Sequence, residues 1–141
     1  PECQCLLSRL RSDLGAVLAA AAEGGLGALP ADALEWSPEA ALLVVLAARG
    51  YPGAYAKGGV IGGLEAAAAA GAKVFHAGTA EDGEGRVTAA GGRVLGVTAL
   101  GAGVTEAQEA AYAAVDAIQW EDGFCRRDIG YRAVAREARG E

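Results

Sequence analysis

Residues 40–48 read Ala40-Ala41-Leu42-Leu43-Val44-Val45-Leu46-Ala47-Ala48, an uncharged apolar run that a glycine- and proline-containing loop follows. A short, continuous run rich in Val and Leu is typical of a central strand buried on both faces, and a short helix is the alternative interpretation. Three more strands are predicted further along the chain, over residues 73–77, 86–89 and 93–100. We therefore expect a sheet built around residues 40–48.

Turn and helix signals separate these strands. The turn at residues 81–85 is expected to join the strands over 73–77 and 86–89 as a hairpin. Helices are predicted over 64–70, over 105–118 and, as a short frayed piece, over 134–139. The expected apolar face of the middle one is formed by Ala107, Ala111, Ala114, Val115 and Ile118. Thr105 and Gln108 fit the T-x-x-Q capping box, so Thr105 is expected to cap the middle one. Helices on a mainly antiparallel sheet make the fold class α+β.

The first part of the chain has a different pattern. Apolar residues recur every three or four positions over residues 3–23, which predicts one long amphipathic helix that Gly24-Gly25 ends. The expected organisation is a helical segment 1–25, a linker 26–33, a domain 34–135 that opens with a short strand at 34–36, and a tail 136–141. Because little precedes the helix to cover its stripe and the chain has no Met, we expect a piece of a larger protein that self-associates in isolation.

Composition excludes several classes of function. A net charge of −6 argues against a nucleic acid or an anionic membrane as the partner. The longest apolar runs, residues 14–22 and 40–48, are too short to cross a bilayer, and no secretory leader pattern is present. Cys3, Cys5 and Cys125 are odd in number and lack a second pair that would complete a zinc site. We expect a cytoplasmic protein with reduced thiols and no metal site.

Two segments could bind an anion. Arg126 and Arg127 lie close to Arg132 in an otherwise acidic chain, and the planar guanidinium group matches phosphate or carboxylate. The alternative is a solvated pair balanced by Asp128, Glu121 and Asp122. The glycine-rich loop 50–59, with Gly53 and Lys57, could form an anion-binding nest, or it could be an ordinary loop, because it matches no phosphate-loop motif.

The remaining polar residues indicate structure rather than catalysis. His76, the only histidine, follows an apolar strand and is expected to hydrogen-bond a neighbour, while Thr79 shapes the next loop. Glu81, Asp82 and Glu84 are expected at a solvated hairpin tip. No paired acid and base, triad or metal cluster is apparent, so no catalytic residue is predicted.

Five stretches, in this order, extend almost from the first residue to the last: Pro1-Glu2-Cys3-Gln4 with Arg11-Ser12-Asp13-Leu14; Gly50-Tyr51-Pro52-Gly53-x-Tyr55-x-Lys57-Gly58; Lys73-Val74-Phe75-His76-Ala77-Gly78-Thr79; Gly91-Gly92-Arg93-Val94-Leu95-Gly96-Val97-Thr98-Ala99-Leu100-Gly101; and Arg126-Arg127-Asp128-Ile129-Gly130-Tyr131-Arg132. Together they resemble the C-terminal portion of glycinamide ribonucleotide synthetases, also called phosphoribosylamine–glycine ligases. Each stretch is weak alone, and the five in order are specific.

The resemblance implies part of an ATP-grasp ligase of de novo purine biosynthesis. Such an enzyme uses ATP and Mg²⁺ to activate glycine as an acyl phosphate, which the amine of 5-phosphoribosylamine attacks. The products are glycinamide ribonucleotide, ADP and phosphate. The family's metal-binding Glu and Asn precede the residue matching Pro1, so the isolated chain is expected to be inactive and to bind neither ATP nor Mg²⁺.

The resemblance also places segments and site residues. Residues 1–25 correspond to the last helix of the ATP-grasp domain, and residues 34–135 correspond to the small C-terminal domain over the active site. Related ATP-grasp enzymes hold a ribose phosphate with a basic pair in a similar late segment. By that analogy Arg126 and Arg127 bind the substrate phosphate, with Lys57 and Gly53 beside them. The candidate pocket-wall residues are Tyr51, His76 and Thr79.

Other classes of function stay open at this point. The chain could be a free-standing, non-enzymatic module that binds a phosphorylated metabolite. It could also be a structural interaction domain, in which case replacing Arg126 and Arg127 would leave substrate affinity unchanged.

Overall fold

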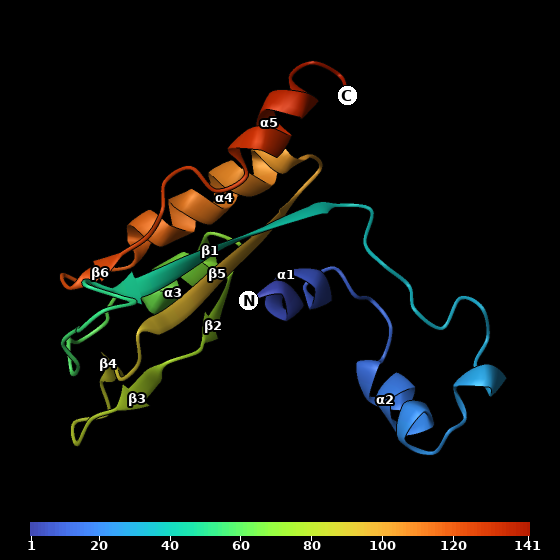
Figure 1. The fold of residues 1–141 in the computed structure, drawn as a ribbon, viewed down its shortest axis with the longest axis horizontal. Coiled ribbons are helices and arrows are strands. Elements are labelled where there is room, and N and C mark those ends of the chain that lie inside the picture. Colours follow the sequence, from blue (N-terminus) through green and yellow to red (C-terminus); the bar gives the residue numbers. More distant parts are fainter.

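The computed structural model describes all residues, 1–141, and its centre is a four-stranded antiparallel sheet (Figure 1). The strand order is β2 (Lys73–His76), β5 (Arg93–Gly101), β1 (Ala40–Ala48) and β6 (Gly123–Phe124). The predicted strand over residues 40–48 is confirmed, and it lies inside the sheet between β5 and β6. The α+β class with a mainly antiparallel sheet is confirmed as well.

The pairing of β1 with β5 sets which side chains form the core. The register runs from Ala40 opposite Gly101 to Leu46 opposite Leu95, and directly opposed residues share a face of the sheet. On one face this places six buried apolar side chains in three facing pairs: Leu42 with Ala99, Val44 with Val97, and Leu46 with Leu95. Because successive residues point to opposite faces, Val45 and Gly96 lie on the other face.

Each face of the sheet has its own helical cover. Helix α4 (Val104–Ala117) packs on β1 and β5, and α3 (Leu64–Ala69) packs between α4 and β2. The buried residues of α4 are Ala107, Ala111, Ala114 and Val115, so small side chains let the helix lie close to the strands. This agrees with the predicted apolar face. Helix α1 (Glu2–Leu7) contacts the other face, where the Gln4 side chain lies against Gly96.

The predicted cap of α4 is wrong. The helix begins one residue before Thr105, after Gly103, and no side chain of its own caps it. Glu137 of α5 (Tyr131–Glu137) does so instead, accepting hydrogen bonds from the Val104 and Thr105 amides at 2.8 and 2.9 Å and from the Thr105 hydroxyl. A carboxylate suits the helix N-terminus because the free N–H groups there carry partial positive charge. Gln108 is left free for another partner.

The predicted hairpin has a different first strand. Residues 73–76 pair with β5, and the hairpin is formed by β3 (Thr79–Glu81) and β4 (Val87–Ala89). Gly78 makes the change of partner feasible: a Cβ there would lie 2.5 Å from the Arg93 carbonyl oxygen. The chain therefore leaves the β5 ladder at Gly78. The tip is as predicted, with Asp82 accepting bonds from the Glu84 and Arg86 amides.

The prediction of a single long N-terminal helix is also wrong, because the structure has two short helices: α1 ends at Leu7, and α2 (Leu14–Ala22) is separate from it. Residues between them pair with a distant segment: the Ser37 amide donates to the Arg9 carbonyl at 2.7 Å, and the Arg11 amide donates to the Glu35 carbonyl at 2.9 Å. Asp13 then caps α2 by accepting from the Gly15 amide at 2.8 Å. The predicted strand at 34–36 is reduced to one bridge, between Trp36 and Leu10.

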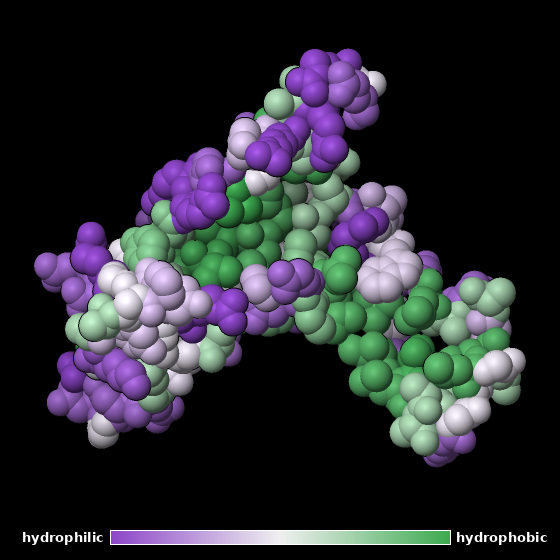
Figure 2. All heavy atoms as spheres, in the orientation of Figure 1, coloured by the Kyte–Doolittle hydropathy of each residue, from purple (hydrophilic) through white to green (hydrophobic).

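Residues 10–36, with α2 and the short 3-10 helix η1 (Leu26–Ala28), form an arm that projects from the sheet (Figure 1). No residue of α2 is buried, and Leu18 is 58% exposed. Apolar side chains cover much of the arm (Figure 2), and Leu26 and Leu34 are among them. No helix of the chain is both long and apolar enough to cross a membrane.

The arm leads to a prediction about association. An exposed apolar surface of this kind drives self-association in water, so the 141-residue chain should form oligomers whose average mass rises with concentration. Leu18→Glu should lower that mass, measured by sedimentation equilibrium. Ala16→Glu, which adds the same charge on an exposed position of α2 without removing a large side chain, is the control. A monomeric parent chain, or equal effects of both variants, would contradict this account.

The Glu137 cap leads to a prediction about pH. The bonds from Thr105 and then Val104 lower the pKa of Glu137 below its ordinary value of 4.5. A group with a lowered pKa in the folded state stabilises the fold above its unfolded pKa, and this contribution is lost as the pH falls through the folded value. Glu137→Gln should therefore lower the melting temperature by a few degrees at pH 7, with the difference vanishing in acid. Glu109→Gln, at an exposed position on α4, is the control. A pH-independent difference for Glu137→Gln would contradict the role of its charge.

Candidate functional site

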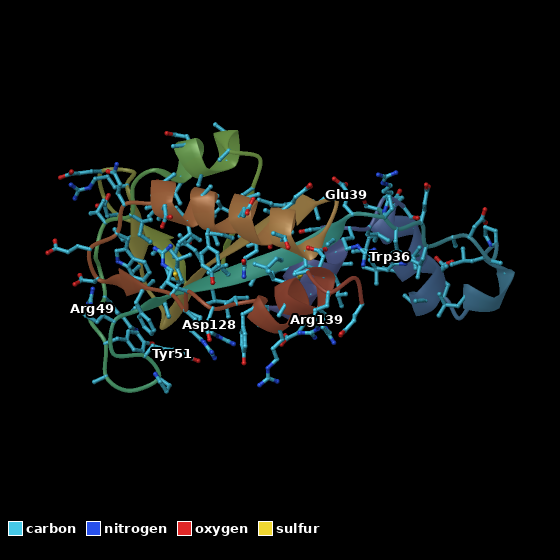
Figure 3. All side chains as sticks on the ribbon, turned by 90° about the horizontal axis from the view of Figure 1, so that it is seen from above. Trp36, Glu39, Arg49, Tyr51, Asp128 and Arg139 are labelled. Carbon is cyan, nitrogen blue, oxygen red and sulfur yellow. The ribbon has the colours of Figure 1, made fainter.

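Several loops meet at the end of the sheet where β1 stops. The Arg49 amide donates to the Asp122 carbonyl at 2.7 Å, the Ala48 amide donates to the Gly92 carbonyl at 2.8 Å, and the Gly58 amide donates to the Ala89 carbonyl at 2.7 Å. The glycine-rich loop thus lies against the connections before β5 and β6. Figure 3 shows Arg49 and Tyr51 at this end, with Asp128 further along the same side. The candidate site is formed by this loop and by residues 123–130, which we call the tail segment.

The two arginines of the tail segment are each held by a carboxylate. Arg126 makes a two-pronged contact with Asp128, with Nε–Oδ1 and Nη2–Oδ2 distances of 2.9 and 2.6 Å. Arg127 Nη1 lies 2.6 Å from Oδ1 of Asp116 on α4. The side chains are 69% and 61% exposed, so water and solutes reach both. The predicted balance by Asp128 is confirmed, whereas Glu121 and Asp122 pair with neither arginine.

These contacts fix the charge state of the pair. Hydrogen bonding to Asp128 raises the pKa of Arg126, and hydrogen bonding to Asp116 raises the pKa of Arg127. In turn, Arg126 lowers the pKa of Asp128. Arg126, Arg127 and Asp128 are therefore charged at neutral pH. Because a guanidinium group has five N–H donors, each arginine keeps donors for a further anion.

Helix α4 also holds the backbone of the tail segment. The Tyr112 hydroxyl donates to the Arg126 carbonyl at 2.8 Å and accepts from the Ile129 amide at 3.0 Å. One turn earlier, Gln108 Nε2 donates to the Ile129 carbonyl at 2.6 Å. The Arg127 guanidinium carbon lies 5.6 Å from the centre of the Tyr112 ring, within the range of a cation–π contact.

Sequence reasoning missed these α4 residues. Gln108, Tyr112 and Asp116 are spaced by four, so they form one stripe on the helix. We call this stripe the α4 clasp. The spacing was visible in the sequence, but nothing local indicated that the stripe faces another segment.

The two ends of the tail segment are anchored separately. Gly123 and Phe124 pair with Ala48 and Ala47 of β1. At the other end Gly130 adopts a φ of +82°, and a Cβ there would lie 2.5 Å from Cδ1 of Leu42. Only glycine combines that backbone conformation with such close approach. The segment therefore runs along the edge of β1 in one defined path.

A cavity of about 290 Å³ lies beside the start of the tail segment. Its walls are mainly apolar, and Arg127 is the one charged residue among them: Leu46, Val115, Ile118, Trp120, Gly123, Phe124, Cys125 and Arg127. Burial raises the pKa of the Cys125 thiol, which therefore stays protonated. All three cysteines are free. An apolar lining does not suit a phosphate group.

The glycine-rich loop is ordered by aromatic packing. The Tyr51 ring lies so close to Gly92 that a Cβ there would be 2.4 Å from Tyr51 Cδ2. The Tyr51 and Tyr55 ring centres are 6.4 Å apart. Gly53 and Lys57 belong to the same loop, and no hydrogen bond or salt bridge ties Lys57 to another side chain. None joins the loop to Arg126 or Arg127 either.

His76 and Thr79 lie elsewhere on the sheet. The distance from His76 Nδ1 to Thr79 Oγ1 is 2.9 Å, so the predicted hydrogen bond of His76 to a neighbour is confirmed. His76 ends β2, the outer strand on the side opposite to β6, and two strands separate it from the tail segment. The structure therefore brings together Arg126 and Arg127 but does not place His76 or Thr79 beside them.

No three His, Cys, Asp or Glu side chains lie close enough together to bind a metal ion. No acid–base pair lies beside the arginines other than their own counterions. The geometry of this site suits binding of an anionic group.

The family model described as "Phosphoribosylglycinamide synthetase, C domain" matches residues 41–132. This range begins in β1 and ends in α5, so it includes the sheet, the α4 clasp and both arginines. The chain belongs to this family. The resemblance seen in the five sequence stretches is thereby confirmed.

Curated relatives of this C domain carry the name phosphoribosylamine–glycine ligase. The protein of Mesorhizobium japonicum is 59% identical over 137 residues, which are 97% of this chain and 31% of that protein. The protein of Rhizobium meliloti is 61% identical over the same share of each chain. The chloroplastic protein of Arabidopsis thaliana is 54% identical over 97% of this chain and 26% of that protein. The C-domain chain thus spans less than a third of the length of these relatives.

A solved structure supports the same family. The phosphoribosylamine–glycine ligase of Thermotoga maritima superposes on this chain with a TM-score of 0.71 at 32% sequence identity. The match covers 92% of this chain and 30% of that protein. The fold of the C domain is therefore shared across this sequence distance.

Proposed function

We propose that this chain works as the C-terminal part of a phosphoribosylamine–glycine ligase. The reaction would join 5-phosphoribosylamine to glycine with the conversion of ATP to ADP and phosphate, and it would yield glycinamide ribonucleotide for purine biosynthesis. The names of the curated relatives support this proposal. The chain would contribute contacts to the substrate phosphate and packing between domains.

The ordered arginine pair carries this proposal. Arg126 and Arg127 are adjacent, exposed and held on a segment whose path α4 and β1 fix. A phosphate group offers several acceptor oxygens, which suit the donors that Asp128 and Asp116 leave free. Because both carboxylates offset the positive charge, the chain alone should bind phosphate weakly. A bound phosphate would compete with Asp128 for Arg126.

Other parts of the site are assigned lesser roles. We propose that Lys57 and the loop at Gly53 approach the same phosphate, because this loop and the start of the tail segment share one end of the sheet. Tyr51 would form part of the pocket wall. For His76 and Thr79 the wall role needs a substrate that extends across the sheet end, since they lie beyond β5 and β1.

The catalytic machinery would lie in the remainder of the ligase. ATP and Mg²⁺ would bind there, and the metal ion would offset the negative charge that develops on phosphate. Residues 1–25 would complete the preceding domain, residues 26–33 would link it, and residues 34–135 would form the C domain, ahead of the tail 136–141. On this account the isolated chain lacks ligase activity and works in the cytoplasm as part of the whole enzyme.

The test is kinetic and uses the full-length ligase that carries this chain. Arg126→Ala and Arg127→Ala should each lower kcat/KM for phosphoribosylamine by about 10- to 100-fold, the size of one charge-assisted hydrogen bond. The KM values for ATP and glycine should not change. For each variant, phosphoribosylamine, ATP and glycine are titrated separately.

Arg139→Ala is the matched control. Arg139 is similarly exposed and also pairs with a carboxylate, that of Glu141, but it lies beyond α5. Unchanged constants for all three variants would mean that the basic pair is structural. Ligase activity of the 141-residue chain alone would overturn the assignment of catalysis to the rest of the enzyme.

A further inference from the structure

We propose that Tyr112 and Gln108 of the α4 clasp are positioning residues for phosphate binding: they hold the backbone of residues 126–129 so that Arg126 and Arg127 present their donors in a fixed geometry. This inference rests on the proposed function, since it concerns the same phosphate. Tyr112 itself touches no substrate and acts through the arginines.

Tyr112 reaches both arginines at once. Its hydroxyl closes a four-residue turn by donating to the Arg126 carbonyl and accepting from the Ile129 amide. Its ring, partly buried against the core, lies under the guanidinium group of Arg127. One side chain thus fixes the backbone at one arginine and the side chain of the other.

No strand pairing holds the middle of the tail segment. The pairing with β1 stops at Phe124, and no backbone N–H of residues 125–129 reaches a backbone carbonyl. The bonds from Tyr112 and Gln108 therefore replace the ladder that a longer strand would supply. Without them, the segment would keep the packing of Cys125 and Ile129 on the core, the ion pair of Arg127 and the bond from the Tyr131 amide to the Asp128 carbonyl. The ligand would then have to order more of the backbone, and the cost of that ordering would weaken binding.

The chemistry of the clasp suits the task. The carbonyls of Arg126 and Ile129 are turned toward α4, where the Tyr112 hydroxyl and the Gln108 amide satisfy them. Both arginine side chains nevertheless stay exposed: Arg126 pairs with Asp128, and Arg127 lies against Tyr112 and Asp116 of α4. Phosphate binding depends on the mutual orientation of these two groups, because a guanidinium group donates in a fixed plane.

The test uses Tyr112→Phe in the full-length ligase, a change that keeps the ring and removes only the hydroxyl. We expect the KM for phosphoribosylamine to rise by roughly 5- to 30-fold, as for one or two lost hydrogen bonds. The kcat and the KM values for ATP and glycine should not change. Gln108→Met, close in shape but without a donor, should act in the same direction. Tyr131→Phe, which removes a hydroxyl on α5 that accepts only from Arg132, is the control.

The same substitution in an Arg126→Ala, Arg127→Ala background separates the two proposals. If the clasp acts through the arginines, Tyr112→Phe adds no further rise in KM there. If the arginine variants raise the KM for phosphoribosylamine and Tyr112→Phe alone does not, the positioning role of Tyr112 is wrong and the proposed function stands. If the arginine variants change no constant, the proposed function fails, and the positioning role fails with it.

A second measurement does not depend on activity. In the parent chain the Ile129 amide donates to a side chain and not to solvent, so its hydrogen exchange should be slow. In Tyr112→Phe it should exchange at least tenfold faster, while amides of β1 and β5 keep their protection. Fast hydrogen exchange of the Ile129 amide in the parent chain would contradict the proposed positioning role of Tyr112.

Discussion

The antiparallel pairing of β1 with β5 is the contact on which the rest of the structure depends. Its register places six buried apolar side chains of the two strands on one face, and α4 covers that face mainly with alanines. Because alanine has so short a side chain, α4 lies close to the sheet, and its Gln108, Tyr112 and Asp116 come within reach of the segment along the edge of β1. The position of the two arginines is thus a consequence of how the core packs.

The sequence predicted correctly those helices and strands whose residue pattern lies within the element itself. The apolar run at residues 40–48 and the alanine face of α4 carry their own periodicity, and both are found as expected. The errors arose where a distant partner decides the outcome. Residues 9–11 leave the helical path because they pair with residues 35–37, and Glu137 takes over the N-terminus of α4 although it lies more than thirty residues away. The spacing of residue types within one element does not indicate either of these long-range contacts.

In the candidate site, too, the sequence indicated features that depend on neighbouring residues and missed those that depend on distant ones. Residue type and proximity in sequence were enough to single out Arg126 and Arg127 as candidates for anion binding, to name Asp128 as a possible counterion, and to foresee a hydrogen-bonded His76. Asp116 and Tyr112 could not be assigned, because their partners lie more than ten residues away along the chain. The glycine-rich loop with Lys57 shares the sheet end but not a direct contact with the arginines.

The central claim is that a phosphate group binds at Arg126 and Arg127. The most direct measurement is a titration of the isotope-labelled chain with ribose 5-phosphate, followed by NMR of the arginine side-chain Nε–H and backbone amide signals. At millimolar ligand the Arg126, Arg127 and Ile129 signals should shift along one saturable curve, those of Arg139 should stay in place, and ribose without phosphate should have no effect. Absence of any shift at the two arginines, or saturable shifts confined to another part of the chain, would contradict the account.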